Sequence, residues 1–187
     1  MTDRDVTIAP FNGVWPTIHE TAFIAPGCRI IGNVTIHAHA SVWYNCVIRG
    51  DANRIVIGAR TNIQDGSVVH CDSPKPKRPE GFPTLIGEDV LIGHMAMIHG
   101  CTLADRSFVG LGSIVMDGCT LEEEAMLGAG AMLTPGKVIG RRQLWMGRPA
   151  AYARDINDDQ FADMQAGVAG YVQNAKLHAA SHGEAEG

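Results

Sequence analysis

The sequence predicts an all-β solenoid followed by a C-terminal helix, and two observations support this prediction. Aliphatic residues recur at every sixth position over most of the chain, and glycine often follows them directly. The 187 residues are also poor in rings, with 6% aromatic against 45% hydrophobic residues and 22 glycines. A core of aliphatic side chains interrupted by glycine must be thin and regular. The length suits one domain with a tail.

We call this spacing of aliphatic residues the six-residue frame. It restarts after a three-residue insertion, after a longer interruption and after the loss of one residue. In a helix of 3.6 residues per turn, residues spaced by six would be spread over all sides and would form no apolar face. Short strands joined by tight corners can instead direct each of these residues inward. We therefore predict short flat sides, each with one inward aliphatic side chain. These anchors are Ile24, Ile30, Ile36, Val42, Ile48, Ile57, Ile63, Val69, Ile86, Ile92, Ile98, Leu103, Val109, Val115, Leu121, Leu127, Leu133 and Ile139.

Residues 71–84 form the longer interruption of this frame. They contain four prolines, which cannot continue a ladder of strands. We predict an excursion loop that leaves the solenoid and returns to it, and a loop of this length is uncommon without a function or mobility.

The frame ends near residue 150, so we assign residues 1–150 to the solenoid and 151–187 to a helix with a tail. From Asp155 onward, apolar residues alternate at steps of three and four, which is typical of an amphipathic helix. Two glycines weaken this helix, which should therefore need tertiary packing. We expect residues 178–187 to fray. The predicted inward residues are Phe161, Met164, Val168, Tyr171 and Ala175.

Charge and composition argue against several partners. The net charge is −5 and no block of Lys or Arg occurs, so nucleic acid and anionic membranes are not expected partners. No apolar run is long enough for a spanning helix, and the N-terminus has no apolar signal core.

Five dispersed cysteines without an export signal indicate reduced thiols and a cytoplasmic protein. We interpret Cys71, Cys101 and Cys119 as small buried residues. We interpret the methionines within the six-residue repeats, or hexads, as core residues. They are Met95, Met97, Met116, Met126 and Met132.

Four segments of the chain carry a family resemblance. They are Ile48-Arg49-Gly50-Asp51, the run from Ile57 to Gly66, Val69-His70, and the run from Ile92 to Cys101. Together they resemble the γ-class carbonic anhydrases and their bacterial relatives, within the hexapeptide-repeat superfamily. The resemblance covers roughly residues 24–139. It implies a left-handed parallel β-helix with three hexads in each triangular coil and a C-terminal helix packed along the prism.

The same resemblance implies an enzyme that hydrates CO2 reversibly to bicarbonate, using a metal-bound hydroxide at a subunit interface. It implies a homotrimer with three shared zinc sites, whose ligands are His70, His94 and His99. An all-imidazole site would also suit Co²⁺ or Fe²⁺. We interpret the remaining histidines as structural or solvated, namely His19, His37, His39, His178 and His182.

The six-residue frame tests this ligand set independently. If residues 71–84 bulge out, His99 lies one full coil beyond His70, at a strand spacing of about 4.8 Å. Two imidazoles stacked in this way can share a zinc ion, whose Zn–N bonds are about 2.0–2.1 Å. His94 lies on the preceding side of the triangle. We expect it to reach the pair of a neighbouring subunit.

The frame also places Arg49 one coil before His70, and Asp65 one coil before His94. A trimer that joins the histidines would bring Arg49 toward Asp65 of its neighbour. The net energy of this ion pair would be small, because both charges lose water. The resemblance gives both residues an interface role and places Asp51 near the arginine.

Three further residues resemble catalytic residues of the family. Gln64 corresponds to the residue that orients the hydroxide, and Asn62 to a position near the substrate. Tyr171 corresponds to a tyrosine near the site of relatives without a glutamate shuttle. Ala52 stands where the best-characterised archaeal type has a glutamate, and the loop's one glutamate is Glu80. We therefore expect slow proton export and a weak enzyme.

Two other functions stay open on the sequence alone. One is an acyl-CoA enzyme, either a thioesterase built on the metal site or a hexapeptide acyltransferase. The other is a non-catalytic trimeric scaffold in which the metal only joins the subunits. The sequence leaves the native metal, the pathway and the role of the loop undetermined.

Overall fold

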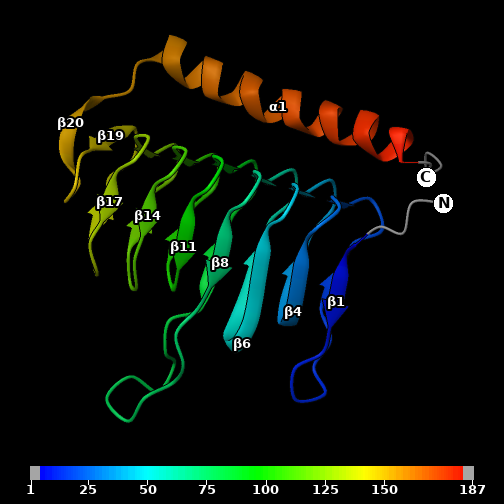
Figure 1. Ribbon diagram of the computed structural model, residues 1–187. Coiled ribbons are helices and arrows are strands. Elements are labelled where there is room, and N and C mark those ends of the chain that lie inside the picture. The colour runs from blue at the N-terminus through cyan, green and yellow to red at the C-terminus, as the bar shows by residue number, and fades with distance from the viewer. Residues whose placement is uncertain (1–4, 183–187) are drawn as a thin grey trace.

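The computed structural model describes residues 5–182 and shows a parallel β-solenoid with one long helix along its side (Figure 1). In the middle coils each strand pairs in parallel with the strand three places further along the chain. Thus β7 (Asn62–Ile63) pairs with β10 (Leu91–Ile92), and β8 (Val68–His70) pairs with β11 (Met97–His99). One coil therefore contributes three short strands, and the stacked coils form a prism with three faces. The predicted all-β solenoid is confirmed.

One face of the prism is a separate eight-stranded sheet, to which the helix is adjacent; we call it the covered face. Its last two strands are antiparallel, so the sheet continues a few residues beyond position 150. Besides β7 and β10, its strands are β3 (Phe23–Ile24), β5 (Ser41–Val42), β13 (Phe108–Val109), β16 (Met126–Leu127), β19 (Gln143–Met146) and β20 (Ala151–Asp155).

The other two faces belong to one twelve-stranded sheet, because two long strands run across the corner between them. These are β4 (Arg29–Ile36) and β6 (Val47–Ile57). We call the face with β8 and β11 the open face; it also contains β1 (Thr7–Ala9), β14 (Ile114–Val115) and β17 (Met132–Leu133). The third face contains β2 (Thr17–Ile18), β9 (Thr84–Ile86), β12 (Thr102–Leu103), β15 (Thr120–Leu121) and β18 (Val138–Ile139).

The core is the interior of the prism, as the six-residue frame predicts. Seventeen of the eighteen anchor residues are buried, and Ile24 alone is half-buried. Glycine follows many anchors because the next coil stacks too closely for a side chain. At Gly93, for example, a Cβ atom would lie 2.5 Å from the backbone nitrogen of Leu111.

The interpretation of the methionines as core residues is wrong for three of the five, while Met126 packs against a small core cluster. Met95 and Met97 are 70% and 40% exposed, Met116 is exposed, and the remaining two are half-buried. Met97 directly precedes the inward Ile98, and successive strand side chains point to opposite sides. Met95 stands at a corner with φ of 58°. The hexad frame holds one inward aliphatic residue per side, and these methionines are its neighbours.

Helix α1 (Asp158–Ser181) lies along the covered face and contacts β3, β5, β7 and β10 (Figure 1). It begins at a capping box, in which Asn157 Oδ1 accepts a hydrogen bond from the backbone nitrogen of Gln160 at 2.9 Å. Its predicted inward residues do face the solenoid: Met164, Val168 and Ala175 are buried, and Phe161 and Tyr171 are half-buried.

The expected fraying from residue 178 is wrong for 178–181, which are helical. The physical reason is a contact with the other end of the chain. The hydroxyl of Tyr44 lies 2.8 Å from His178 Nδ1 and 2.9 Å from His182 Nε2. Residues 183–187, which the same expectation covered, lie outside the described residues.

The cysteines agree with the interpretation as packing residues, since all five are buried and unpaired. The Cys71 thiol, for example, donates to the backbone oxygen of Asn53 at 3.3 Å. The described part of the chain contains no helix long and apolar enough to cross a membrane.

Candidate functional site

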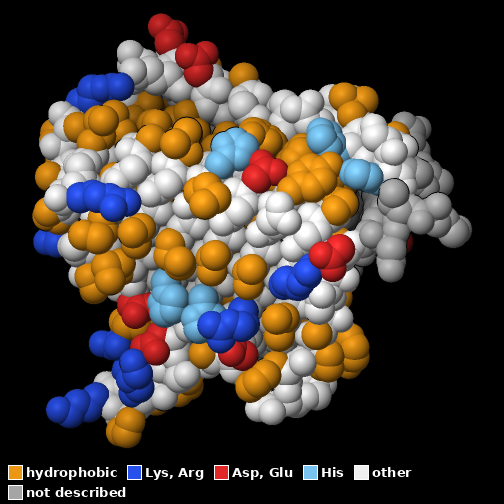
Figure 2. Space-filling view, viewed as in Figure 1, with side chains coloured by type: hydrophobic (Ala, Val, Ile, Leu, Met, Phe, Trp, Pro, Cys, Tyr) orange, Lys and Arg blue, Asp and Glu red, His pale blue; other side chains and the backbone are white. Residues whose placement is uncertain are grey.

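His70 and His99 lie side by side at the ends of β8 and β11 on the open face. The two strands pair in register, with Val69 opposite Ile98 and His70 opposite His99. The ring centroids are 5.0 Å apart, and His70 Nδ1 is 3.0 Å from His99 Nε2. Figure 2 shows histidines gathered beside charged side chains on this side of the molecule. The predicted stacking of the two histidines is confirmed.

Each of these two imidazoles also contacts a carboxylate. His70 Nε2 is 2.8 Å from Asp51 Oδ1, and His99 Nδ1 is 2.6 Å from Asp117 Oδ1. A neutral imidazole that donates its one N–H to a carboxylate keeps a lone pair on its other nitrogen. In both residues that other nitrogen faces the partner ring, so the two lone pairs converge.

His94 follows β10 and lies at the edge of the covered face. Its Nδ1 is 2.8 Å from Asp65 Oδ2, and its side chain is 48% exposed. The predicted stacking of Asp65 with His94 is therefore confirmed. Within residues 5–182 of a single chain, no three His, Cys, Asp or Glu side chains gather closely enough to hold a metal.

Arg49 lies in the same column as His70, because Ile48 pairs with Val69. Within the chain its guanidinium forms an ion pair with Asp51, which also accepts the hydrogen bond from His70. Burial raises the pKa of Asp51, but the hydrogen bonds from His70 and Arg49 outweigh it and lower the pKa below its usual range. The expected pair between Arg49 and Asp65 of a neighbour stays a prediction.

The residues that resemble catalytic ones lie on the same side as His94. Asn62 and Gln64 are 0% and 4% exposed, and Gln64 Nε2 donates to Asn62 Oδ1 at 3.0 Å. In the described chain, Asn62 Nδ2 has no hydrogen-bond partner. An unpaired buried amide is costly unless something donates to or accepts from it in the working state.

Tyr171 comes to this region from α1. Its ring packs edge-on against Trp43, with centroids 5.3 Å apart. Burial raises the pKa of the Tyr171 phenol, and the charge of Asp65 raises it further. Tyr171 therefore packs beside Trp43 and stays protonated at neutral pH.

The excursion loop is present as predicted. Asp72 and Phe82 exchange two backbone hydrogen bonds of 2.9 and 3.0 Å, so the chain leaves and returns at one point. At its tip, Lys75 and Arg78 exchange two more. The return strand β9 pairs with β6, and the stacking of the coils continues undisturbed.

The residues present fit a metal ion. Two nitrogens bound tetrahedrally to zinc at 2.0–2.1 Å would lie about 3.3 Å apart, close to the 3.0 Å between His70 Nδ1 and His99 Nε2. Histidine ligands usually donate their other N–H to a carboxylate or carbonyl group, and all three candidate ligands have such a carboxylate. His94 Nε2 is left for a metal when Nδ1 donates to Asp65.

Sequence reasoning missed Asp117, the carboxylate partner of His99. A signal for it existed in the frame, since Asp117 comes one coil after His99 at the following corner. The register places Met116 opposite His99, because β11 and β14 pair Ile98 with Val115. Asp117 reaches back from the next position.

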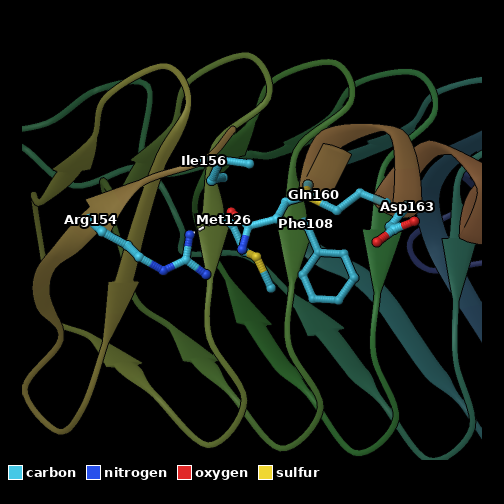
Figure 3. A pocket seen from close by; sticks show the side chains of 7 residues that line it. Phe108, Met126, Arg154, Ile156, Gln160 and Asp163 are labelled. Atoms are coloured by element: carbon cyan, nitrogen blue, oxygen red, sulfur yellow. Dashed lines mark hydrogen bonds between the residues drawn. The ribbon is translucent and has the colours of Figure 1, made fainter. Parts of the chain in front are cut away.

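A shallow cavity of about 330 Å³ lies elsewhere, between the beginning of α1 and the strands β13 and β16 (Figure 3). Phe108 and Met126 line it from the strands, and Arg154 donates a hydrogen bond to Gln160 beside it. None of the predicted site residues lines this cavity, so it is separate from the histidines.

The repeat defines a hexapeptide-repeat protein. A family model described as bacterial transferase hexapeptide (six repeats) matches residues 16–50. A solved hexapeptide transferase family protein from Anaplasma phagocytophilum is 42% identical, with a TM-score of 0.85 over 91% of this chain and 96% of that one. This likeness confirms the predicted left-handed β-helix.

Two further relatives are named as carbonic anhydrases and indicate which hexapeptide-repeat family the chain belongs to. A probable carbonic anhydrase from Methanocaldococcus jannaschii is 44% identical over 156 residues, which are 83% of this chain and 94% of that protein. The mitochondrial γ carbonic anhydrase 1 of Arabidopsis thaliana is 38% identical over 167 residues, 89% of this chain. The aligned region spans 60% of the length of the Arabidopsis protein. The chain belongs to the γ-class carbonic anhydrase family.

Proposed function

We propose that this chain is a metal-dependent carbonic anhydrase that hydrates CO2 reversibly to bicarbonate at sites shared between the subunits of a homotrimer. The observation that carries the proposal is the arrangement of the three histidines. His70 and His99 converge at 3.0 Å, and His94 lies on another face with its own carboxylate. The names of the archaeal and plant relatives support this reaction class.

His70 and His99 of one subunit and His94 of a neighbour would hold the metal. Zinc is the first choice for three imidazoles, with Co²⁺ or Fe²⁺ as substitutes. When bound, zinc supplies a Lewis acid that lowers the pKa of its water ligand, to about 7 in carbonic anhydrases. The carboxylates of Asp51 and Asp65 would orient the rings of His70 and His94, though neither is itself a ligand in this proposal.

Asn62 and Gln64 would position the reactants. Because Gln64 Nε2 donates to Asn62, its Oε1 is free to accept a hydrogen bond from the attacking water and so to orient it. The unpaired Nδ2 of Asn62 can then donate to an oxygen of CO2 or bicarbonate. Tyr171 would border this side of the site from α1, where its ring packs against Trp43.

Proton export would be slow, because Ala52 follows Asp51 and offers no carboxylate. We therefore expect turnover to rise with the concentration of an imidazole buffer, which can carry the proton away.

The composition of the open face supports the trimer. From β6 to β17 on this face, the residue before each inward aliphatic is itself apolar, yet remains in contact with solvent. These outward residues are Val47, Val68, Met97, Ile114 and Met132. Figure 2 shows hydrophobic side chains along this face. Contact with further copies of the chain would cover them and bring a second chain's His94 toward His70 and His99.

The five buried thiols also suit a reducing compartment, and on that ground we place the protein in the cytoplasm.

A mixing experiment tests the shared site. Homotrimers of His70→Ala and of His94→Ala should each lose zinc and CO2 hydration. After subunit exchange at equal amounts, about a quarter of the sites should combine intact histidines from two different chains and regain activity. Stopped-flow CO2 hydration and bound zinc measure the recovery.

The matched control is a mixture of His70→Ala with His99→Ala. Both changes affect the same half of the site, so no mixed trimer rebuilds a complete one. Recovery in this control would show that the histidines act across a different interface. Zinc-replete wild-type protein without CO2 hydration at neutral to alkaline pH would overturn the proposed activity.

An acyl-CoA thioesterase or acyltransferase is the second candidate, favoured by the transferase name of the Anaplasma protein. Thiol release from a panel of acyl-CoAs, with and without an acceptor amine, separates it from CO2 hydration. A protein that binds zinc as a trimer but has neither activity would instead be a metal-joined scaffold.

A further inference from the structure

The carboxylate of Asp117 stands at the corner after β14 and is directed at His99. Its Oδ1 is 2.6 Å from His99 Nδ1, and the two side chains are 32% and 33% exposed. This is the shortest of the three contacts between a candidate ligand and its carboxylate. A charge-assisted hydrogen bond of this length is stronger than a neutral one.

The backbone is shaped to admit this contact. A Cβ atom on Gly100 would lie 2.2 Å from Asp117 Oδ1 and 2.8 Å from the Cβ of Phe82. Gly100 also has φ of +52°, which glycine adopts readily. The residue next to His99 therefore leaves the space through which the carboxylate reaches the ring.

The excursion loop covers the same corner. Phe82 lies against Gly100 and Gly118, and a Cβ atom on Gly118 would be 2.9 Å from the Phe82 ring. Phe82 thus packs beside both neighbours of the Asp117–His99 contact, with its Cβ at Gly100 and its ring at Gly118. Packing of Phe82 against these two glycines holds the end of the excursion loop at this corner.

A second corner of the prism has the same construction with a different outcome. A Cβ atom on Gly87 would lie 2.2 Å from Asp105 Oδ1, as at Gly100. There the carboxylate accepts the backbone N–H of Glu88 at 2.9 Å. A carboxylate packed over a glycine therefore occurs at two corners of the prism. At Asp105 it accepts from a backbone N–H, whereas at Asp117 it contacts an imidazole.

An anionic acceptor at Nδ1 holds the proton of His99 on that nitrogen. The lone pair is then on Nε2, which is the nitrogen that faces His70. The same contact also fixes the rotation of the ring, so that Nε2 stays directed at His70. A carboxylate in this position normally improves the affinity of a histidine for a metal.

We propose that Asp117 is a positioning residue that selects the tautomer and orientation of His99 for metal binding. The inference rests on the metal site of the proposed function and adds to it a residue outside the ligand set. Asp117 would touch neither the metal nor the substrate.

The test compares Asp117→Asn and Asp117→Ala with Asp105→Asn as the matched control, all in the full-length trimer. Zinc affinity is measured by competition with a chelator, and coordination by the visible spectrum of the Co²⁺-loaded protein. We expect zinc to bind 10–100-fold more weakly in Asp117→Ala, with an altered cobalt spectrum. Asp117→Asn should show a smaller loss. Asp105→Asn should keep the wild-type affinity and spectrum, even where its thermal unfolding midpoint falls.

Gly100→Ala provides a second route to the same contact, since the added methyl group would displace the carboxylate while leaving Asp117 in place. Because it also strains the backbone at a φ of +52° and meets Phe82, its unfolding midpoint is measured beside its zinc affinity. It should weaken zinc binding in the same direction. If Asp117→Ala does not assemble, the near-isosteric Asp117→Asn and Gly100→Ala still decide the question.

His99→Ala separates this inference from the proposed function. If His99→Ala loses the cobalt spectrum while both Asp117 variants retain wild-type affinity and spectrum, the role of Asp117 is refuted and the metal site stands. If wild-type protein shows no His99-dependent binding of zinc or cobalt, the metal site itself is refuted, and the role of Asp117 with it.

Discussion

The covered face and the open face place their side chains by the same local pattern, but their outward residues differ in burial. On both, the residue before each inward aliphatic points outward. On the covered face these residues lie beneath α1 or beside it, and Asn62 and Leu91 are 0% and 8% exposed. On the open face Met97 is 40% exposed at the equivalent position, and Val68 is half-buried.

The difference shows which surface the chain completes by itself. Helix α1 supplies the second layer for one face, as a solenoid face needs a partner for its apolar side chains. The open face also carries apolar outward residues, from β6 to β17, and has no such layer within the described chain. The histidines divide in the same way: His94 is at the edge of the completed face, and the converging pair is on the uncompleted one.

The largest effect is expected from a charge on the open face. Met97→Lys should prevent trimer formation, because a lysine in an apolar interface is costly. With the shared site proposed above, CO2 hydration should then fall by about 100-fold with the loss of metal. Sedimentation velocity and zinc content check this outcome.

Val138→Lys is the matched control for Met97→Lys. Val138 is 50% exposed and holds the equivalent outward position on the third face. It should remain trimeric and active. If both variants remain trimeric and active, the open face is not the interface.

The next effect should come from the covered face. Leu91 is buried, and it lies near Gly167 of α1, where an added Cβ would be 3.4 Å from Leu91 Cδ1. Leu91→Ala should reduce the free energy of unfolding by about 2 kcal/mol, measured by urea titration. The trimer should persist. Loss of the trimer without loss of protomer stability would reverse the assignment of the two faces.

A smaller effect is expected at the corner that fastens the beginning of α1. The Glu124 side chain is 6% exposed and pairs with Arg141 and Arg142, and Arg142 in turn pairs with Asp158. Glu124→Gln should lower the free energy of unfolding by about 1.5 kcal/mol at neutral pH.

This effect should depend on pH. Burial raises the pKa of Glu124, but hydrogen bonds from Arg142 and Arg141 lower it below the ordinary value of 4.5. A carboxyl group with a lowered pKa stabilises the fold above its ordinary pKa, and this contribution is lost as pH falls through the folded-state value. Wild type and Glu124→Gln should therefore converge in acid. A difference that grows toward acid would contradict the assignment.

The smallest effect is expected at the end of α1. Tyr44→Phe removes the hydroxyl that contacts His178 and His182, and should cost about 1 kcal/mol. Hydrogen exchange should accelerate in the last turn of the helix. Tyr152→Phe is the control, since Tyr152 is 52% exposed and its 3.2 Å bond to Asp155 lies at the surface. Equal acceleration in both variants would remove the role of Tyr44.

Most of the solenoid could be predicted from the sequence because each coil repeats one geometry. A single inward position per side, such as Ile63 or Ile92, determines which residues stack. The same frame placed His70 beside His99 and Asp65 beside His94. These predictions succeed because strand spacing is constant and the loop adds nothing to it.

What could not be predicted depends on which way a neighbour of the frame points, or on contacts between distant residues. The six-residue period identifies the inward residue but does not show which of its neighbours point to solvent. For this reason the prediction that Met97 lies in the core was wrong. One residue is lost between Ile98 and Leu103, which shifts the next coil and moves Asp117 out of the column of His99. Tyr44 and His178 meet across 134 positions without any local pattern.

The excursion loop has a consequence for how the chain can change. Since Asp72 and Phe82 bond to each other at its base, the chain re-enters the prism where it left. Residues can be added to or removed from the loop tip, or a whole domain inserted there, while β8 and β11 keep their pairing. The number of residues between His70 and His99 is therefore free to vary, whereas their distance in space is set by a single strand spacing.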